Sequence, residues 1–212
     1  MIKTPIELRN EKLGNKVVKA LQGRHFEAVY VETKEAALEK ALSYIPEKAV
    51  VSWGGTSTAK EIGLLDALHK GDYNLIDRDA AAPEDKIDVA RKALFSDCYI
   101  MGSNAISEDG QIVNIDGLGN RLAALLFGPK HVIIVVGINK VVRDLNAAMT
   151  RAQTIAAPIN KQRFPGNTPC LITGSCGNCT TLDSICAQTV VTRLCKPAGR
   201  IKVILVGENL GF

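Results

Sequence analysis

The chain has 212 residues, a formal net charge of +4, 46% hydrophobic residues and 23% charged residues. This composition is typical of one soluble globular domain, residues 1–212, whose core needs no disulfide bonds. The positive charge is mild and scattered, which argues against nucleic acid as a partner. The N-terminus is charged and no apolar run is long enough to cross a bilayer, so we expect a cytoplasmic protein with no membrane partner.

Short apolar runs alternate with helical patterns along the whole chain. Helical spacing begins with Leu13, Val17 and Leu21, and continues in later segments. The predicted helices are 34–45, 57–70, 84–95, 120–127, 141–156 and 182–195. The predicted strands are 27–31, 49–53, 73–77, 97–101, 111–115, 132–136 and 201–206. Several strands lack polar alternation, which indicates burial on both faces. The alternation predicts a Rossmann-like α/β fold, with a mainly parallel sheet and helices on both faces.

One segment breaks this pattern. Residues 157–181 have no clear periodicity and are rich in Pro, Gly, Asn, Thr and Cys. A long irregular stretch inside a compact domain is normally functional, disordered or organised by a bound group. We therefore treat 157–186 as a Cys-rich aperiodic segment of the domain.

The first candidate binding turn follows the strand at 49–53. Two glycines allow a tight turn, and three hydroxyl side chains then open a helix, where free amide groups attract anions. The candidate residues are Gly54, Gly55, Thr56, Ser57 and Thr58. The alternative is that Thr58 and Glu61 form a capping box.

Two further turns carry a cation near a predicted helix start, where the macrodipole disfavours positive charge. The candidate residues are Gly117, Gly119, Asn120 and Arg121 in one turn, and Asn139 and Lys140 in the other. Since the carboxyl ends of parallel strands share one sheet edge, the three turns together predict a site for a small anionic metabolite. The alternative for Arg121 is an ion pair with a nearby Asp.

Four cysteines form the spacing C-x5-C-x2-C-x6-C, namely Cys170, Cys176, Cys179 and Cys186. The cytosol keeps thiols reduced, which favours a metal centre over structural disulfides. The spacing is near, but does not match, that of plant-type iron–sulfur proteins. We predict one four-cysteine centre that binds an iron–sulfur cluster, with zinc as the alternative. A redox pair of Cys176 and Cys179, or four free thiols, also remains open. A helix start at 180–182 is expected to favour thiolate at Cys179. Cys98 is expected to be a small core residue.

Several segments together resemble one known family. SWGGTSTAKEIGL, GSNAISEDGQIVNIDGLGNR, FGPKHVIIVVGINKVV, AAPINKQRF, TPCLITGSCGNCTTLDSIC and RIKVILVGENLGF are similar to the lactate-utilisation (LUD) domain family, which includes lactate-utilisation protein C. The resemblance covers nearly the whole chain, and the C-terminal cysteine cluster marks a variant of the family. It implies a fold similar to the sugar-phosphate isomerase and CoA-transferase class.

The resemblance also implies a function. It suggests a subunit or accessory of the oxidation of lactate to pyruvate, working beside iron–sulfur redox subunits. Two other functions stay open: a non-catalytic interaction module organised by metal, and a stand-alone enzyme acting on a sugar phosphate or an acyl-CoA. No catalytic residue can be read from the sequence.

Overall fold

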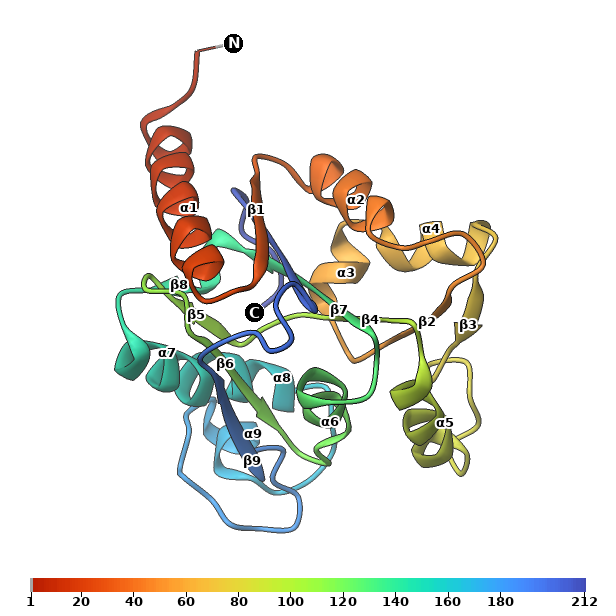
Figure 1. Ribbon diagram of the computed structural model, residues 1–212. Coiled ribbons are helices and arrows are strands. Elements are labelled where there is room, and N and C mark those ends of the chain that lie inside the picture. The colour runs from red at the N-terminus through yellow and green to blue at the C-terminus, as the bar shows by residue number, and fades with distance from the viewer. Residues whose placement is uncertain (1) are drawn as a thin grey trace.

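A six-stranded parallel sheet forms the centre of the computed structural model, which describes residues 2–212 (Figure 1). From one edge to the other, its strands are β1 (Glu27–Val31), β10 (Ile201–Val206), β7 (His131–Gly137), β4 (Cys98–Met101), β2 (Val50–Trp53) and β3 (Asn74–Ile76). Every neighbouring pair is parallel, so the predicted Rossmann-like α/β fold is confirmed. The carboxyl ends of all six strands therefore lie at one edge of the sheet.

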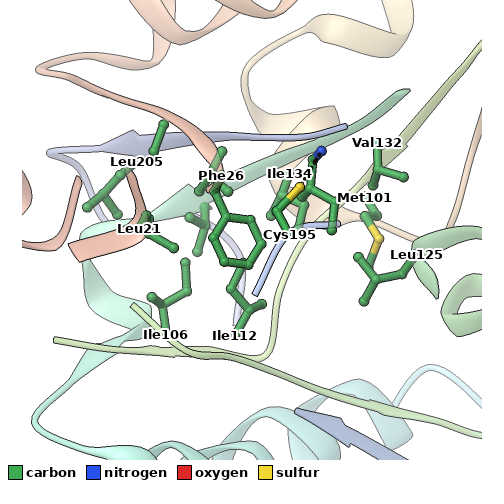
Figure 2. Packing of buried hydrophobic residues seen from close by; sticks show 14 of the residues in the cluster. Leu21, Phe26, Met101, Ile106, Ile112, Leu125, Val132, Ile134, Cys195 and Leu205 are labelled. Carbon is green, nitrogen blue, oxygen red and sulfur yellow. Dashed lines mark hydrogen bonds between the residues drawn. The ribbon is translucent and has the colours of Figure 1, made fainter. Parts of the chain in front are cut away.

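Both faces of this sheet are covered. The helices on one face are α2 (Lys34–Ser43), α3 (Ser57–Glu61) and α4 (Leu64–Lys70), whose apolar side chains share a core with Ile133 and Val135 of β7. The other face packs on α1 (Pro5–Gly23), α6 (Asn120–Leu126) and a second sheet. Figure 2 shows this second core, where Leu21 and Leu125 lie on the same side of the sheet as Val132 and Ile134. The helix α5 (Lys86–Lys92) and a 3-10 turn at Ala93–Phe95 connect β3 to β4.

The second sheet has four strands and was not predicted as a separate sheet. Its strands are β8 (Val141–Val142), β5 (Ala105–Ser107), β6 (Ile112–Asp116) and β9 (Gln188–Thr192). β6 pairs antiparallel with both β5 and β9. The strand predicted at 111–115 is therefore real, but it lies outside the main parallel sheet. A small third core joins this sheet to α7 (Leu145–Arg151).

The predicted helix at 182–195 is wrong. Residues 188–192 form β9, and residues 181–187 form turns and bends. Thr189, Val190, Val191 and Thr192 are β-branched, which favours an extended backbone that can pair with β6. Val190 packs against the core, whereas Thr189 and Val191 are exposed. Side chains that alternate between the core and solvent in this way are typical of a strand with one buried face.

The third candidate turn also differs from the prediction. Lys140 ends a 3-10 turn, Ile138–Lys140, that leads into β8, and the next helix begins only at Leu145 after the N-cap Asp144. The helix predicted at 141–156 is therefore shorter at its start. It is longer at its end, because a π-helical turn at Ala152–Ala156 leads into α8 (Ala157–Lys161).

The segment predicted as aperiodic contains two short helices. One is α8, and the other is α9 (Pro169–Thr173), in which Pro169 occupies the first turn. Residues 162–168 and 174–187 remain irregular. Pro169 lies at a helix start, the position where a missing amide proton costs least. Pro158 instead lies inside a continuous helical run, directly after the π-helical turn at Ala152–Ala156.

Within residues 2–212, none of the helices combines the length and the apolar character that a membrane span requires.

Gly14 fixes how closely α1 approaches the sheet. A β-carbon built on Gly14 would lie 2.2 Å from Cδ2 of Tyr30 on β1. Alanine normally favours a helix by about 1 kcal/mol over glycine, but this clash should outweigh that gain. We expect Gly14→Ala to lower the free energy of unfolding by about 1–3 kcal/mol in urea denaturation. Gly23→Ala is the matched control, since nothing lies within 4 Å of its added β-carbon. An unchanged or raised stability in Gly14→Ala would contradict the close contact.

Candidate functional site

A polar pocket of about 70 Å³ lies at the carboxyl ends of three strands of the parallel sheet. The residues that follow the strands line it: Gly55, Thr56, Ser57 and Thr58 after β2, Gly102, Ser103 and Asn104 after β4, and Lys140 after β7. The remaining lining residues are Ile115, Arg121, Asn160, Arg163 and Phe212. Of the eleven ligand-binding residues predicted from the sequence, six line this pocket: Gly55, Thr56, Ser57, Thr58, Arg121 and Lys140. We call it the strand-end pocket.

Lys140 is the most buried cation of the pocket, with 4% of its surface exposed. Its Nζ donates a hydrogen bond of 3.3 Å to Oγ1 of Thr58, which is itself 1% exposed. No carboxylate of residues 2–212 lies within ion-pair distance of this ammonium. Burial, with the neighbouring charge of Arg151, lowers the pKa of Lys140 to about 8. A bound anion would restore the stabilisation that the ammonium loses by burial.

Arg121 forms one wall of the pocket, and the fold holds it firmly. Its side chain is 14% exposed, and Nη1 donates to Oδ1 of Asn114 at 2.9 Å. Nη2 donates to the carbonyl oxygen of Ile115 at 2.5 Å. Nε lies 3.7 Å from Oδ2 of Asp116, so the alternative of an ion pair with a nearby Asp is present in the structure. The guanidinium therefore adds positive charge to the pocket from a fixed position.

The turn after β2 is built differently from the capping box that we considered. Thr56, not Thr58, caps α3, because its Oγ1 accepts from the amide of Ala59 at 3.3 Å. Glu61 instead accepts from the amide of Gly211 at 2.9 Å. Gly54 makes room for Arg121, since an added β-carbon would lie 3.0 Å from its Cδ.

Four other predicted residues have different surroundings. Gly117 lies beneath the Cys-rich segment, where an added β-carbon would meet Cα of Ile185 at 3.3 Å. Gly119, with φ of 81°, is the N-cap of α6. Asn120 faces a different surface hollow beside Leu118. Asn139 holds the C-terminal segment, because its Oδ1 accepts from the amide of Leu210 at 3.1 Å.

Several lining residues were missed from the sequence. Gly102, Ser103 and Asn104 directly follow the strand predicted at 97–101, so the same rule that selected the other turns would have found them. Asn160 and Arg163 come from the segment predicted as aperiodic. Arg163 donates to Oδ1 of Asn160 at 3.1 Å, and its charge was the only signal that the sequence offered.

A second cavity, of about 270 Å³, is lined by all four cysteines of the predicted centre. Cys170 lies in α9, Cys176 and Cys179 lie in the irregular stretch, and Cys186 lies just before β9. All four are free thiols. We call this space the cysteine cavity. The structure thus gathers around one space four side chains that span 17 residues of the chain.

The thiols are not arranged for a single ion. Among residues 2–212, no group of three or more Cys, His, Asp or Glu side chains is placed to hold one metal ion. The predicted helix start beside Cys179 is absent, so its dipole cannot favour thiolate there. Burial, and the proximity of the other three cysteines, raises the pKa of Cys186 to about 11. If these thiols were ionised, the thiolates would therefore repel one another unless a bound cation lay between them.

The two remaining cysteines are core residues. Cys98 is fully buried in β4, as expected, and burial raises the pKa of its thiol to about 11. Cys195 is 2% exposed, and its Sγ donates to the carbonyl oxygen of Pro197 at 3.2 Å.

The strand-end pocket and the cysteine cavity are neighbours. Ile115 of β6 lines both. On α8, Asn160 lines the strand-end pocket and the next residue, Lys161, lines the cysteine cavity. The same strand and helix therefore separate the two spaces.

Comparison with known proteins identifies the family. A sequence model of the LUD domain matches residues 14–206. The chain belongs to the LUD domain family. The LUD fold is also seen in a crystal structure of a DUF162 family protein from Deinococcus radiodurans. That protein has 13% identity and a TM-score of 0.55, over 93% of this chain and 98% of the other.

A weaker structural similarity, to eIF2B delta from Chaetomium thermophilum, has 14% identity and a TM-score of 0.35, over 67% of this chain and 57% of the other. It carries no argument about the fold. No curated protein matches this LUD chain. Family membership makes this a lactate-utilisation-related protein.

Removing the Arg121 guanidinium should destabilise the fold. Arg121→Met would leave the buried acceptors of Asn114 and Ile115 unpaired. We expect the free energy of unfolding to fall by at least about 3 kcal/mol, measured by chemical denaturation. Arg91→Met is the control, since Arg91 is 72% exposed and pairs only with Asp88, and should change stability by less than about 0.5 kcal/mol. Equal effects of the two substitutions would refute the clamping role of Arg121.

Proposed function

We propose that this LUD protein binds a small carboxylate, of the 2-hydroxy or 2-oxo acid class, in the strand-end pocket. Within lactate oxidation it would act as a subunit or accessory beside iron–sulfur redox subunits. The observation that carries the proposal is the buried ammonium of Lys140, which has no ion-pair partner among residues 2–212 and lies in a pocket that also contains Arg121 and Arg163.

Charge favours an anion as the ligand. Three cationic side chains line the strand-end pocket, and none of its lining side chains is an Asp or a Glu. The hydroxyls of Ser57 and Ser103 and the amide of Asn104 add donors from separate strand ends. Convergent donors and buried positive charge are the features that recognise a carboxylate or a phosphate.

Size favours a small ligand. The volume of about 70 Å³ is the space open to the centres of water molecules, and it corresponds to roughly five to seven waters at about 10–15 Å³ each. A three-carbon acid is on this scale, whereas a whole sugar phosphate or acyl-CoA is far larger. This argues against the alternative of an enzyme that encloses either of those substrates here.

Chemistry limits what the pocket does alone. Oxidation of a 2-hydroxy acid to a 2-oxo acid removes two electrons and two protons, so an electron acceptor is required. Lys140, with a pKa of about 8, is mostly protonated near neutral pH and holds the anion as an ammonium, so it is not the group that accepts either proton. The proposed role is therefore binding and orientation of the acid, with the electrons passed to a redox group.

Removal of the buried charge tests the ligand site. We expect Lys140→Met to weaken binding of lactate and pyruvate by about tenfold to a hundredfold in isothermal titration calorimetry, because a charge-assisted hydrogen bond contributes roughly 1.5–3 kcal/mol. Lys130→Met is the control: Lys130 is exposed, precedes β7 at the opposite sheet edge, and pairs with Asp97. Unchanged affinity in a folded Lys140→Met protein would overturn the proposal. Binding of inorganic phosphate but of neither acid would reassign the site to phosphate ligands.

The affinity should also depend on pH through Lys140. The ammonium attracts the anion only while it is protonated, and its pKa in the free protein is about 8. The anion raises that pKa in the complex, so affinity should be constant below about pH 8, fall by up to roughly tenfold per pH unit above the pKa of the free protein, and level off once the pH exceeds the pKa of the complex. Calorimetric titrations between about pH 6.5 and about pH 9.5 would measure this. The decline should vanish in Lys140→Met, and its persistence there would exclude Lys140 as the titrating group.

A further inference from the structure

The four cysteines that line the cysteine cavity have no part in the proposed binding of a carboxylate. They come from a short helix, an irregular loop and the start of a strand, yet all face one space of about 270 Å³. Four thiols that converge from different elements are the ligand set of metal–thiolate centres. The sequence shows only the spacing of the four cysteines, and the fold adds that their side chains line one cavity.

The separation of the sulfurs distinguishes between kinds of metal centre. A single zinc ion with sulfur ligands at about 2.3 Å needs its four sulfurs within roughly 4 Å of one another. Among the described residues, no three such side chains reach one ion, although the four thiols line a common cavity. A cluster of several irons has its ligand sulfurs farther apart than a single ion does, so four thiols that line one cavity of about 270 Å³ are compatible with such a cluster.

Lys161 supplies an independent observation. Its side chain lines the cysteine cavity, is 2% exposed, and has no carboxylate of residues 2–212 within ion-pair distance. Its Nζ donates to the carbonyl oxygen of Pro165 at 2.7 Å, which leaves two further N–H groups. A buried ammonium without a counter-ion is costly, and a thiolate-bound cluster carries the negative charge that would offset it.

Hydrogen-bond donors already lie next to two of the sulfurs. The amide of Asn178 donates to Sγ of Cys176 at 3.5 Å. The hydroxyl of Thr168, a residue 1% exposed, lies 3.4 Å from Sγ of Cys170. Donors of this kind stabilise thiolate sulfur and help to set the reduction potential of a cluster.

The loop around the thiols has little else to organise it. Residues 174–187 form no regular element, and Leu182 is fully exposed. The loop contacts the rest of the chain at a few points, such as Gln153 with Asn178 at 3.2 Å and Asp183 with the amide of Asn167 at 3.0 Å. A bound metal centre can supply the missing stabilisation.

We propose that Cys170, Cys176, Cys179 and Cys186 bind one polynuclear iron–sulfur cluster, with the ammonium of Lys161 as its buried countercharge. On assembly, each S–H bond is replaced by an S–Fe bond and the proton passes to solvent, while external ferric and ferrous iron and sulfide supply the cluster at its own oxidation level, so no protein group is oxidised or reduced. The inference is independent of the anion proposal, since either site can bind its ligand if the other does not.

Anaerobic reconstitution tests this proposal on the full chain. The protein is incubated with ferric iron, sulfide and a thiol that reduces part of the iron, then desalted, and iron and acid-labile sulfide are counted per chain. We expect equal iron and sulfide, more than one iron per chain, broad visible absorption, and a paramagnetic resonance signal in one of the oxidised and reduced states. The thermal midpoint should also rise on loading. Zinc in place of iron with no sulfide, a Cys176–Cys179 disulfide under the same conditions, or no bound metal would each overturn the proposal.

Cysteine variants assign the ligands. Cys176→Ser and Cys186→Ser should each lose most of the bound iron, whereas Cys98→Ala, which removes a buried thiol outside the cavity, should keep the wild-type content. Full iron content in both serine variants would contradict the assignment. If a serine variant does not fold, the iron and sulfide content of the wild-type protein still decides the proposal.

A lysine variant tests the countercharge without removing a ligand. Lys161→Met should bind the cluster but lower its reduction potential, because an added electron loses a neighbouring positive charge. Lys19→Met, on the exposed face of α1, is the matched control and should leave the potential unchanged. Equal potentials in all three proteins would remove Lys161 from the site.

Discussion

The guanidinium of Arg121 joins the two sheets of the molecule, and the strand-end pocket is built on that junction. From α6 it reaches the carbonyl oxygen of Gly102 after β4, and on the other side it binds Asn114 and Ile115 of β6. One fixed, planar group thus sets the distance between the parallel sheet and the second sheet. It also places a permanent positive charge at the carboxyl ends of the strands.

The parallel sheet explains why the strand-end pocket is polar while its surroundings are apolar. The three strands whose ends form the pocket, β2, β4 and β7, are buried on both faces, so the first residues beyond their carboxyl ends are the first that can present free polar groups. Three such ends contribute hydroxyls, amides and an ammonium to one small volume. Burial lowers the pKa of Lys140 to about 8, which is consistent with the proposal that a bound anion is its partner.

The sequence predicts the main sheet well because its strands are short, continuous apolar runs bounded by turn residues. It predicts half of the strand-end pocket for the same reason, since residues after a strand can be recognised locally. Arg163 and Asn160 could not be found in this way, because they reach the pocket only through the path of α8. The helix predicted at 182–195 is wrong because Leu182, Ile185 and Cys186 have the i, i+3, i+4 spacing of a helical face. Pairing with β6 instead determines the conformation of Val190 and its neighbours.

The clustering of the cysteines has a similar explanation. Their spacing indicates a metal centre, but only the packing of Ile185 over Gly117 and the start of β9 brings Cys186 back towards Cys170. Two consecutive side chains of one helical turn, Asn160 and Lys161, then face different cavities. No local pattern contains that information, because it depends on where α8 crosses the second sheet.

Ile115 gives the two spaces a common wall one side chain thick, and this has a thermodynamic consequence. An aliphatic side chain has a low dielectric constant and screens charge poorly. With both proposed ligands present, an anion on one side would disfavour an extra electron on the other. Thermodynamic linkage makes this effect reciprocal and equal in free energy. Reduction of the cluster would weaken binding of the anion, so a reduced cluster would release the anion more readily than an oxidised one. This shared wall would thus couple occupancy of the strand-end pocket to the redox state of the cluster without any movement of the backbone.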